Sequence, residues 1–530
     1  MIKLAVALLF GLQAPLYAAT QSAALPQLTD KIFNTWAGPD TPGCAVAIGQ
    51  AGKPVVVRAY GQADLEHHVP NTPETVFEAG SVSKQFTAAA ILLLAQDGKL
   101  SLSDDVRKYL PELPDYGQRI TIDHLLTHTS GLRDWGALVQ MSGWPRGTRA
   151  VTMDQALALT ARQRSLNFQP GTRYSYTNTG YVLAALVVQR VSGKTLAEFT
   201  RERMFAPLGM THTQWRDNFR RVVPDRAIAY SRADAGYEQD MPFEDVIGHG
   251  GILTTVSDLM IWNEALTSKR LGAFVAQHFE QIPALPAGQV SVYGHGLSVT
   301  NFQGAVQVAH DGSTAGYRTW LGRYPEQGLS IALLCNAGDV NPGTLAHAIA
   351  QELLPPSANG AQEQSVPPVS ASLAGTFYNT LTGVKVPLAY RDGGLTLPNG
   401  TLLRALGGRA FAVKSGTFTF ADNDSFIARG PGGDTVRYRR VGDASAPKAY
   451  AGLYRNDEVM TTYQVIPDGA NLDFRIAYRP DFVFHLAPLG PDTFGGDDIV
   501  VRFKRDAKGG VTGASLARER LFDLQFQKLD

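Results

Sequence analysis

The sequence has few cysteines, no excess charge of either sign and no long apolar run beyond its first residues. Only Cys44 and Cys335 occur among 530 residues, too few for a disulfide scaffold. No Cys-His spacing typical of a metal site is present. Lys plus Arg and Asp plus Glu each number 48, so the composition gives no basis for binding nucleic acid or an anionic membrane.

The first residues have the pattern of a signal peptide. Lys3 gives a short positive region, residues 4–12 are apolar, and a small residue follows at Ala18. We expect residues 1–24 to be removed on export, which predicts a periplasmic or secreted protein; the alternative is a buried N-terminal helix. The predicted cleavage site has no Cys nearby, so the sequence does not predict a lipid anchor there. No later segment reaches the roughly 18 apolar residues that a membrane span needs.

Residues 25–354 mix helical and strand patterns. Strands are predicted near both ends of this region, and helices between them. This order predicts an α+β fold, in which one antiparallel sheet is built from both ends and covered by helices. Strands are predicted at 43–49, 54–61, 306–310, 316–324 and 329–334. Cys44 and Cys335 lie in two of the apolar runs, so they are either two buried thiols or a disulfide joining paired strands.

The remainder of the chain has a different texture. Residues 355–371 are rich in Pro, Ser and Gln and predict a linker. Short strand-like runs with Gly or Asp turns follow, and residues 374–379 faintly resemble residues 451–456. We therefore predict two small all-β, barrel-like domains at 372–442 and 449–530. The alternative is one larger β-sandwich.

Ser81 and Lys84 form a Ser-x-x-Lys motif at the start of a predicted helix that runs to about Gln96. A spacing of three residues places both side chains on one helical face. A serine hydroxyl is a weak nucleophile that needs a nearby base, and a buried lysine held neutral can supply it. The same motif also describes an N-cap serine beside a surface lysine, so it needs support from other stretches.

Two further stretches add polar groups. Tyr176 and Asn178 are two residues apart in a predicted loop entering a helix, so both can face one cleft. A tyrosine beside a lysine cation can act as a general base, and Tyr174 is the weaker local candidate.

The second of these stretches lies at the end of a predicted strand. There His310 and Gly312 share one face, and the Ser313 N–H can complete an oxyanion hole with that of Ser81. Each stretch alone is also compatible with an ordinary packed tyrosine or histidine.

The ordered set Ser81-x-x-Lys84, Tyr176-x-Asn178 and His310-x-Gly312 resembles the penicillin-binding-protein and serine β-lactamase superfamily. It is most similar to the branch of class C β-lactamases, D-peptidases and esterases. The resemblance implies a β-lactamase/transpeptidase-like fold with an all-helical subdomain. It also implies an acyl-enzyme on Ser81, with Lys84 and Tyr176 removing its proton, and no metal or organic cofactor.

The resemblance assigns substrate-binding roles to Asn178, His310, Gly312 and Ser313. Asn178 holds the substrate amide, and His310 binds or orients a carboxylate or carbonyl. β-Lactamases usually carry Lys-Thr-Gly where this chain has His310-Asp311-Gly312. The histidine and the two C-terminal β domains are similar to D-aminopeptidases.

A D-stereospecific peptidase or amidase acting on small peptides (D-aminopeptidase or D,D-carboxypeptidase-like) is therefore the first expectation. The alternatives are a promiscuous carboxylesterase or weak β-lactamase, and a non-catalytic penicillin-binding or sensor protein. The expected partner is a small molecule or a short peptide. The sequence leaves the oligomeric state open.

Overall fold

The computed structural model describes residues 25–145, 147–355, 369–413, 416–430, 432–443 and 446–529. The predicted signal peptide at 1–24 and most of the predicted linker at 355–371 lie outside these residues. Within the described ranges, no helix combines the length and the apolar character needed to cross a membrane.

A six-stranded antiparallel sheet forms the centre of the N-terminal part, in the order β10-β11-β12-β13-β1-β2. Because β1 pairs with β13, the two ends of this part meet in one sheet, which confirms the predicted fold class. Cys44 lies opposite Cys335 in this pairing, and the two form a disulfide. The strands are β1 (Cys44–Gln50), β2 (Lys53–Tyr60), β10 (Ser298–Phe302), β11 (Ala305–Thr314), β12 (Tyr317–Tyr324) and β13 (Leu329–Cys335).

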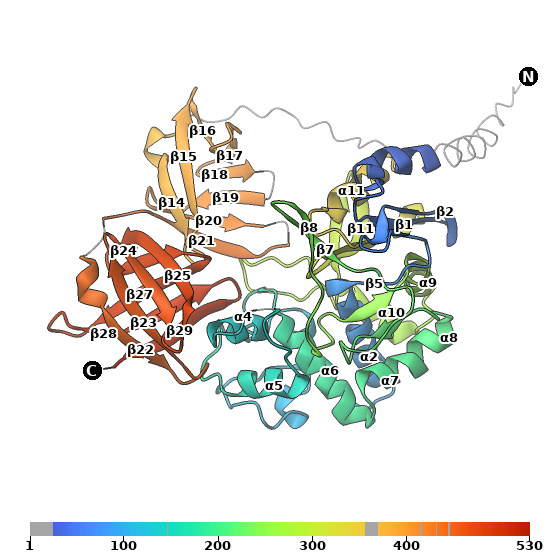
Figure 1. The fold of residues 1–530 in the computed structure, drawn as a ribbon, viewed down its shortest axis with the longest axis horizontal. Helices are drawn as coiled ribbons and strands as arrows, with labels where there is room; N and C mark the ends of the chain where they lie inside the picture. The colour runs from blue at the N-terminus through green and yellow to red at the C-terminus, as the bar shows by residue number, and fades with distance from the viewer. Residues whose placement is uncertain are drawn as a thin grey trace, which may run out of the picture.

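Helices cover both faces of this sheet (Figure 1). One face packs on α2, whose residues from Lys84 to Leu94 are all buried, and on α6 and α9. The other face packs on α11 and on helical residues 25–33. The helices are α2 (Lys84–Gln96), α3 (Ile122–Leu126), α4 (Trp135–Met141), α5 (Met153–Ala161), α6 (Asn178–Ser192), α7 (Leu196–Thr200), α8 (Ala206–Leu208), α9 (Val256–Thr267), α10 (Ala273–Phe279) and α11 (Pro342–Leu353).

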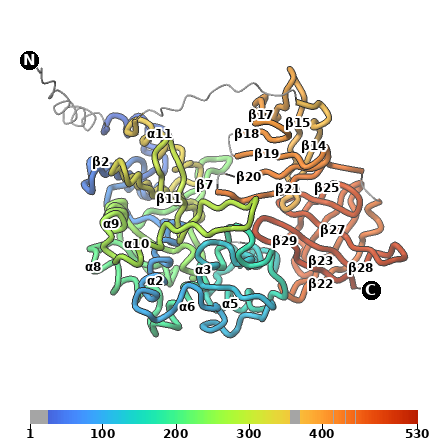
Figure 2. The backbone as a smooth tube through the Cα atoms, turned by 180° about the vertical axis from the view of Figure 1, so that it is seen from behind, coloured from blue at the N-terminus to red at the C-terminus, as the bar shows by residue number. Residues whose placement is uncertain are grey.

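Two all-β bodies follow, as Figures 1 and 2 show from opposite sides. The first is an eight-stranded sheet, and the second is a closed eight-stranded barrel. Each has its own apolar core, so the chain does not form the single larger sandwich. The faint repeat coincides with their first strands, β14 (Gly375–Asn379) and β22 (Gly452–Asn456).

The other strands of the first body are β15 (Lys385–Arg391), β16 (Gly394–Thr396), β17 (Arg404–Gly407), β18 (Ala410–Val413), β19 (Gly416–Phe420), β20 (Ser425–Arg429) and β21 (Thr435–Arg440). Those of the barrel are β23 (Thr461–Asp468), β24 (Asn471–Ile476), β25 (Arg479–Gly490), β26 (Thr493–Gly496), β27 (Ile499–Arg505), β28 (Val511–Arg518) and β29 (Leu521–Lys528).

The barrel is docked on the helical side of the N-terminal part. Leu138 and Met141 of α4 and Leu159 of α5 belong to the same apolar cluster as the barrel interior. Beside them Arg133 forms a buried ion pair with Glu458, at 2.7 Å. A shared core and a buried ion pair make this a packed interface, which fixes where the barrel loops lie relative to Ser81.

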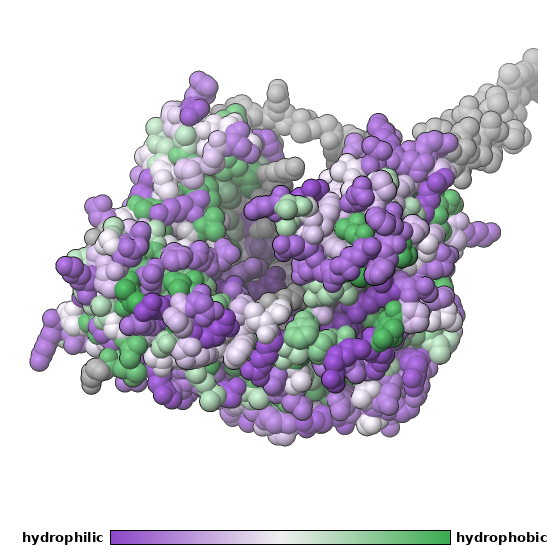
Figure 3. Space-filling view, in the orientation of Figure 1, coloured by the Kyte–Doolittle hydropathy of each residue, from purple (hydrophilic) through white to green (hydrophobic). Residues whose placement is uncertain are grey.

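The eight-stranded sheet also contacts the N-terminal part. Arg429 of β20 donates to the Gly288 carbonyl at 2.8 Å, and Arg173 donates to the Thr435 carbonyl of β21. In the space-filling view, the surface is hollowed between this sheet and the N-terminal part, and hydrophilic residues colour much of the visible interior (Figure 3).

Candidate active site

Ser81 lies in a 3₁₀ turn, Gly80–Ser83, that leads directly into α2. The sequence predicted a helix from Ser81, whereas α2 itself begins at Lys84. A tight turn of this kind is common at helix N-termini. It brings the Lys84 Nζ atom to 3.1 Å from the Ser81 Oγ atom, so the Ser-x-x-Lys pair is in hydrogen-bonding contact.

Lys84 is fully buried. Its Nζ atom donates to the Asn178 Oδ1 atom at 2.9 Å and to the His249 carbonyl at 2.7 Å. Burial holds the pKa of Lys84 well below its usual value of 10.5, and the nearby Arg520 cation lowers it further, against the attraction of Asp134 and Asp311. A neutral amine beside a hydroxyl can accept its proton. The surface-lysine interpretation is therefore wrong for Lys84.

Tyr176 packs beside Lys84. The Lys84 Nζ atom is 4.7 Å from the centroid of its ring. Burial raises the pKa of the Tyr176 phenol, while its hydrogen bond with Ser81 and the Arg520 cation lower that pKa. The hydroxyl, the amine and the phenol that the sequence placed far apart in the chain therefore meet at one point. Tyr174, the weaker candidate, packs against the rings of His128 and Tyr293, as Tyr176 also does.

Asn178 is the first residue of α6, and Thr177 is the N-cap. The Asn178 backbone N–H donates to the Asp134 carboxylate at 2.7 Å. The same carboxylate accepts from the N–H groups of Gly136 and Ala137 at the start of α4. Asp134 therefore joins two helix N-termini, where a negative charge is stabilised, and it fixes the Asn178 amide beside Lys84.

β11 reaches the site at the edge where β10 has ended. β10 pairs with β11 only as far as Ala309, and the turn that carries Ser81 contacts β11 beyond that point. A carbon added at Gly80 would lie 2.8 Å from the Ser313 nitrogen, and one added at Gly312 would lie 3.1 Å from the Ser81 nitrogen. The two backbone nitrogens expected to form an oxyanion hole are therefore neighbours.

Gly312 is required by packing within the protein. A Cβ atom there would lie 2.1 Å from the Thr319 Oγ1 atom and 2.3 Å from the Ala79 carbonyl oxygen. The sequence suggested that this glycine lets the substrate backbone approach. The structure gives a different reason, because the glycine lets β11 approach the chain that leads into Ser81.

Both ring nitrogens of His310 have protein partners. The Nδ1 atom contacts the Asp311 carbonyl, which can only accept, so Nδ1 carries the proton and Nε2 accepts from the Tyr293 hydroxyl at 2.8 Å. Burial lowers the pKa of His310 to about 4, although the Asp311 charge opposes this shift. His310 is thus neutral near pH 7, and it connects β11 to a group of aromatic rings.

His128 belongs to that group of rings. No motif in the sequence assigned it a role. Its Nδ1 atom accepts from the Thr177 N–H at 3.2 Å, and its carbonyl accepts from the Ser175 N–H at 3.0 Å. Its ring centroid lies 4.2 Å from that of Tyr176. The positive φ of 58° at His128 is uncommon for a non-glycine residue. His128 therefore positions the loop that carries Tyr176.

Arg520 is the functional-site residue that sequence reasoning missed most completely. It lies at the tip of the hairpin between β28 and β29 of the barrel, and its guanidinium carbon is 4.8 Å from the centroid of the Tyr176 ring. No local motif marks it, because only the docking of the barrel on α4 brings the hairpin to the site.

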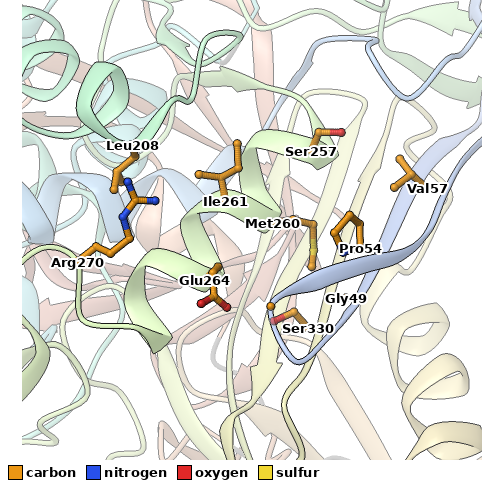
Figure 4. Close-up of a pocket in the computed structure, with 11 residues that line it drawn as sticks. Gly49, Pro54, Val57, Leu208, Ser257, Met260, Ile261, Glu264, Arg270 and Ser330 are labelled. Carbon is orange, nitrogen blue, oxygen red and sulfur yellow. The ribbon is translucent and has the colours of Figure 1, made fainter. Parts of the chain in front are cut away.

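Two pockets adjoin these residues. One of about 260 Å³ is lined by Tyr176, Arg173, Arg520 and residues of both β bodies. Another of about 210 Å³ is lined by Asn178, Trp135, Trp144, Phe243 and His249. A pocket between α9 and the β1–β2 turn, which has Met260, Glu264 and Arg270 in its wall (Figure 4), contains none of the site residues.

The described residues contain one cluster with metal-ligand spacing, formed by Asp64, Glu66 and His67. It lies largely exposed around β3 (Gln62–Asp64), and none of the site residues belongs to it.

The family comparison agrees with this geometry. The Beta-lactamase family profile matches residues 28–354, which include Ser81, Lys84, Tyr176 and β11. The chain belongs to this family. A D-aminopeptidase of Brucella canis is 27% identical over 503 residues, covering 90% of this chain and 93% of that protein.

Solved structures show the same fold. The octameric penicillin-binding protein homologue from Pyrococcus abyssi has a TM-score of 0.56 at 24% identity, covering 85% of this chain and 98% of that one. D-amino acid amidase from Ochrobactrum anthropi SV3 has a TM-score of 0.53 at 24% identity, covering 62% and 98%. Family, fold and relatives together identify the chain as a β-lactamase-family hydrolase.

Proposed function

We propose that the protein is an exported serine hydrolase that forms an acyl-enzyme on Ser81, and that it acts on small peptides or amides with D-residues. The observation that carries the mechanism is the fully buried Lys84 amine in contact with the Ser81 hydroxyl. The D-preference is supported by the D-aminopeptidase similarity, which covers 90% of this chain. Export is supported by the Cys44–Cys335 disulfide, a bond typical of oxidising compartments.

The proposed first step is acylation. The Ser81 Oγ atom attacks the substrate carbonyl while its proton passes to the Lys84–Tyr176 pair. The developing oxyanion lies between the N–H groups of Ser81 and Ser313, where fixed donors stabilise negative charge. The pair then gives the proton to the leaving amine, and the C–N bond breaks. Water activated by the same pair hydrolyses the ester and restores the Ser81 hydroxyl.

Substrate binding is assigned to groups beside the nucleophile. The Asn178 amide holds the substrate amide, and the aromatic pocket next to it receives a side chain. Gly312 and Ser313 present backbone to the substrate, and His310 orients it through Tyr293. The domain boundaries proposed are 25–354 for the hydrolase domain, 355–371 for the linker, and 372–442 and 449–530 for the β domains.

The test combines labelling and turnover. A fluorophosphonate probe should label Ser81, with the labelled peptide mapped by mass spectrometry. D-alanyl p-nitroanilide should be cleaved faster than its L-isomer, and Ser81→Ala should lose all turnover while its circular dichroism remains unchanged. Ester or cephalosporin turnover without amide turnover would replace this proposal with the promiscuous esterase or weak β-lactamase. A chain with neither labelling nor turnover would be a binding protein.

Secretion is tested separately from catalysis. The full chain expressed in a Gram-negative host should appear in the periplasmic or extracellular fraction without residues 1–24, as read by N-terminal sequencing. Retention of residues 1–24 on the isolated protein would contradict the export proposal and leave the catalytic one standing.

A further inference from the structure

The Tyr176 ring is in contact with two basic side chains that come from different parts of the chain. Lys84 reaches it from α2, with Nζ 4.7 Å from the ring centroid, and Arg520 reaches it from the barrel, at 4.8 Å. The Arg520 charge also lowers the pKa of both Lys84 and Tyr176. A charge that influences both proton-handling groups lies within reach of a substrate bound at Ser81.

The hairpin that carries Arg520 is held by specific contacts. The Arg520 carbonyl accepts from the Asn167 Nδ2 atom at 3.0 Å and from the Asp134 N–H at 3.2 Å. The Phe522 N–H donates to the Asn167 Oδ1 atom at 3.0 Å. One asparagine therefore binds the backbone of Arg520 and Phe522, and this pair of contacts fixes the chain that leads from the hairpin tip into β29.

Arg520 has a left-handed backbone, with φ of 63°. A glycine or asparagine adopts that conformation at lower free-energy cost, by about 1 kcal/mol. Turn geometry therefore gives no reason for an arginine at this position. Strained residues of this kind are concentrated at ligand-binding and catalytic sites, so the side chain itself is the feature to explain.

The guanidinium is available to a ligand. Within the described part of the chain its two terminal nitrogens donate no hydrogen bond to protein, and its buried Nε atom lies 3.2 Å from the Glu519 Oε1 atom without hydrogen-bond geometry. Its ion pair is with the adjacent Glu519, whose side chain is 69% exposed, and such pairs are weak. About a third of the Arg520 side chain is exposed, and it lines the pocket that Tyr176 also lines.

Other charged groups near the site do not neutralise the Arg520 guanidinium. Asp134 attracts Arg520, but its carboxylate is engaged by backbone N–H groups at two helix starts. Asp434 also lines the pocket, and its charge acts on Arg173. Asp311 is exposed on β11 and is the anion that would suit a substrate ammonium.

We propose that Arg520 is the anion-recognition residue of the cleft, and that the preferred substrate carries a carboxylate close to its scissile carbonyl. A guanidinium binds a carboxylate through two parallel hydrogen bonds, whereas it would repel a free α-ammonium. The proposal rests on the proposed function. The carboxylate comes either from the acyl side or from the C-terminus of the leaving residue.

Matched substrates separate these sources. On the acyl side the set is D-alanyl, N-acetyl-D-alanyl and N-succinyl-D-alanyl p-nitroanilide, which are cationic, neutral and anionic. On the leaving side it is N-acetyl-D-alanyl-D-alanine and its C-terminal amide. We expect an anionic substrate of one set to exceed its neutral partner at least tenfold in kcat/KM, the effect of one charged hydrogen-bonded pair.

Variants then assign that preference to Arg520. Arg520→Gln should bring the ratio of anionic to neutral kcat/KM to about one, and Arg520→Lys should keep a ratio between that value and the wild-type one. Arg520→Glu should lower the ratio below one and favour the substrate with the free amine. Arg455→Gln, at an exposed barrel arginine, is the matched control and should leave the ratio unchanged. The ratio is the readout because Arg520 also influences the Lys84 pKa, which changes absolute rates for every substrate.

Each result decides between the two proposals. A ratio that survives Arg520→Gln, or a wild-type preference for the free amine, overturns the role of Arg520 and leaves the acyl-enzyme proposal intact. Absence of both probe labelling at Ser81 and turnover of every substrate overturns the proposed function itself.

Discussion

Removal of the buried Glu458 carboxylate should destabilise the docking of the barrel more than removal of an exposed carboxylate. Arg133 is 1% exposed and Glu458 8% exposed, and they meet at 2.7 Å. Arg133 also donates to the Gln163 side chain, the Ser165 hydroxyl and the Asp523 carbonyl. After Glu458→Ala the guanidinium would remain buried among neutral acceptors only.

An uncompensated buried charge costs about 3–5 kcal/mol, so Glu458→Ala should lower the free energy of unfolding by that amount. Glu458→Gln keeps an acceptor and should cost about 1–3 kcal/mol. The double variant Arg133→Met with Glu458→Leu removes both charges and should recover most of the loss. Asp457→Ala, at the neighbouring exposed pair with Arg455, is the control and should change stability by less than about 1 kcal/mol.

Urea unfolding followed by two signals measures this effect. All six tryptophans precede the β domains in the sequence. The centroid of the Trp144 ring lies 5.6 Å from the guanidinium carbon of Arg479 in the barrel. Tryptophan fluorescence therefore reports on the hydrolase part and its interface, and far-ultraviolet circular dichroism reports on the whole chain. Equal stability of Glu458→Ala and Asp457→Ala would refute the reasoning, because it would mean that Arg133 does not depend on its buried partner.

Three further results are expected. Because the Arg520 cation lowers the pKa of Lys84, Arg520→Gln should move the acidic limb of the kcat/KM profile to higher pH, as measured on a neutral ester; an unmoved limb contradicts the coupling. Gly312→Ala should abolish turnover and cost about 1–3 kcal/mol in stability through overpacking, whereas Gly343→Ala, which has space in α11, should leave both unchanged. The pKa of His310 is about 4 in the fold against 6.5 ordinarily, so the unfolded chain binds the proton first. Stability should therefore fall by roughly 3 kcal/mol as the pH falls from 6.5 to 4, and His310→Gln should flatten that dependence in urea titrations.

The fold class and the contact between Ser81 and Lys84 could be predicted because their signals lie in short stretches of sequence. The apolar run inside α2 is buried on all sides, so its hydrophobicity is read directly from the sequence. Strand patterns at both ends predicted one sheet built from both ends, and the structure adds that β1 pairs with β13, which brings Cys44 opposite Cys335. The spacing of Ser81 and Lys84 is fixed by helical geometry, and the structure places both atoms in contact.

The rest of the site depends on tertiary packing and had no local signal. Position 312 must be a glycine because the Thr319 hydroxyl and the Ala79 carbonyl occupy the space of a Cβ atom. Both groups come from other elements of the fold. Tyr293 lies in a segment without regular periodicity, yet its hydroxyl is the hydrogen-bond partner of the His310 Nε2 atom. Arg520 occupies an ordinary hairpin tip, and only the barrel interface defines its position.

The interface also determines how the role of the C-terminal domains can be tested. Deletion of residues 372–530 would expose Leu138, Met141 and Leu159, which now pack against the barrel core, and would remove the carboxylate that pairs with Arg133. We expect that truncated chain to aggregate. A change in its substrate preference would therefore not separate the effect of the lost cleft residues from the effect of the lost interface.

A change confined to the hairpin tip keeps those contacts. Glu519→Asn with Arg520→Gly supplies residues that favour a tight hairpin, and the Asn167 amide can still bind the backbone at positions 520 and 522. This double variant should remain folded and keep esterase activity on a neutral substrate while losing discrimination by charge. Unaltered discrimination in a folded double variant would show that the barrel contributes stability to the hydrolase part and no selectivity to its cleft.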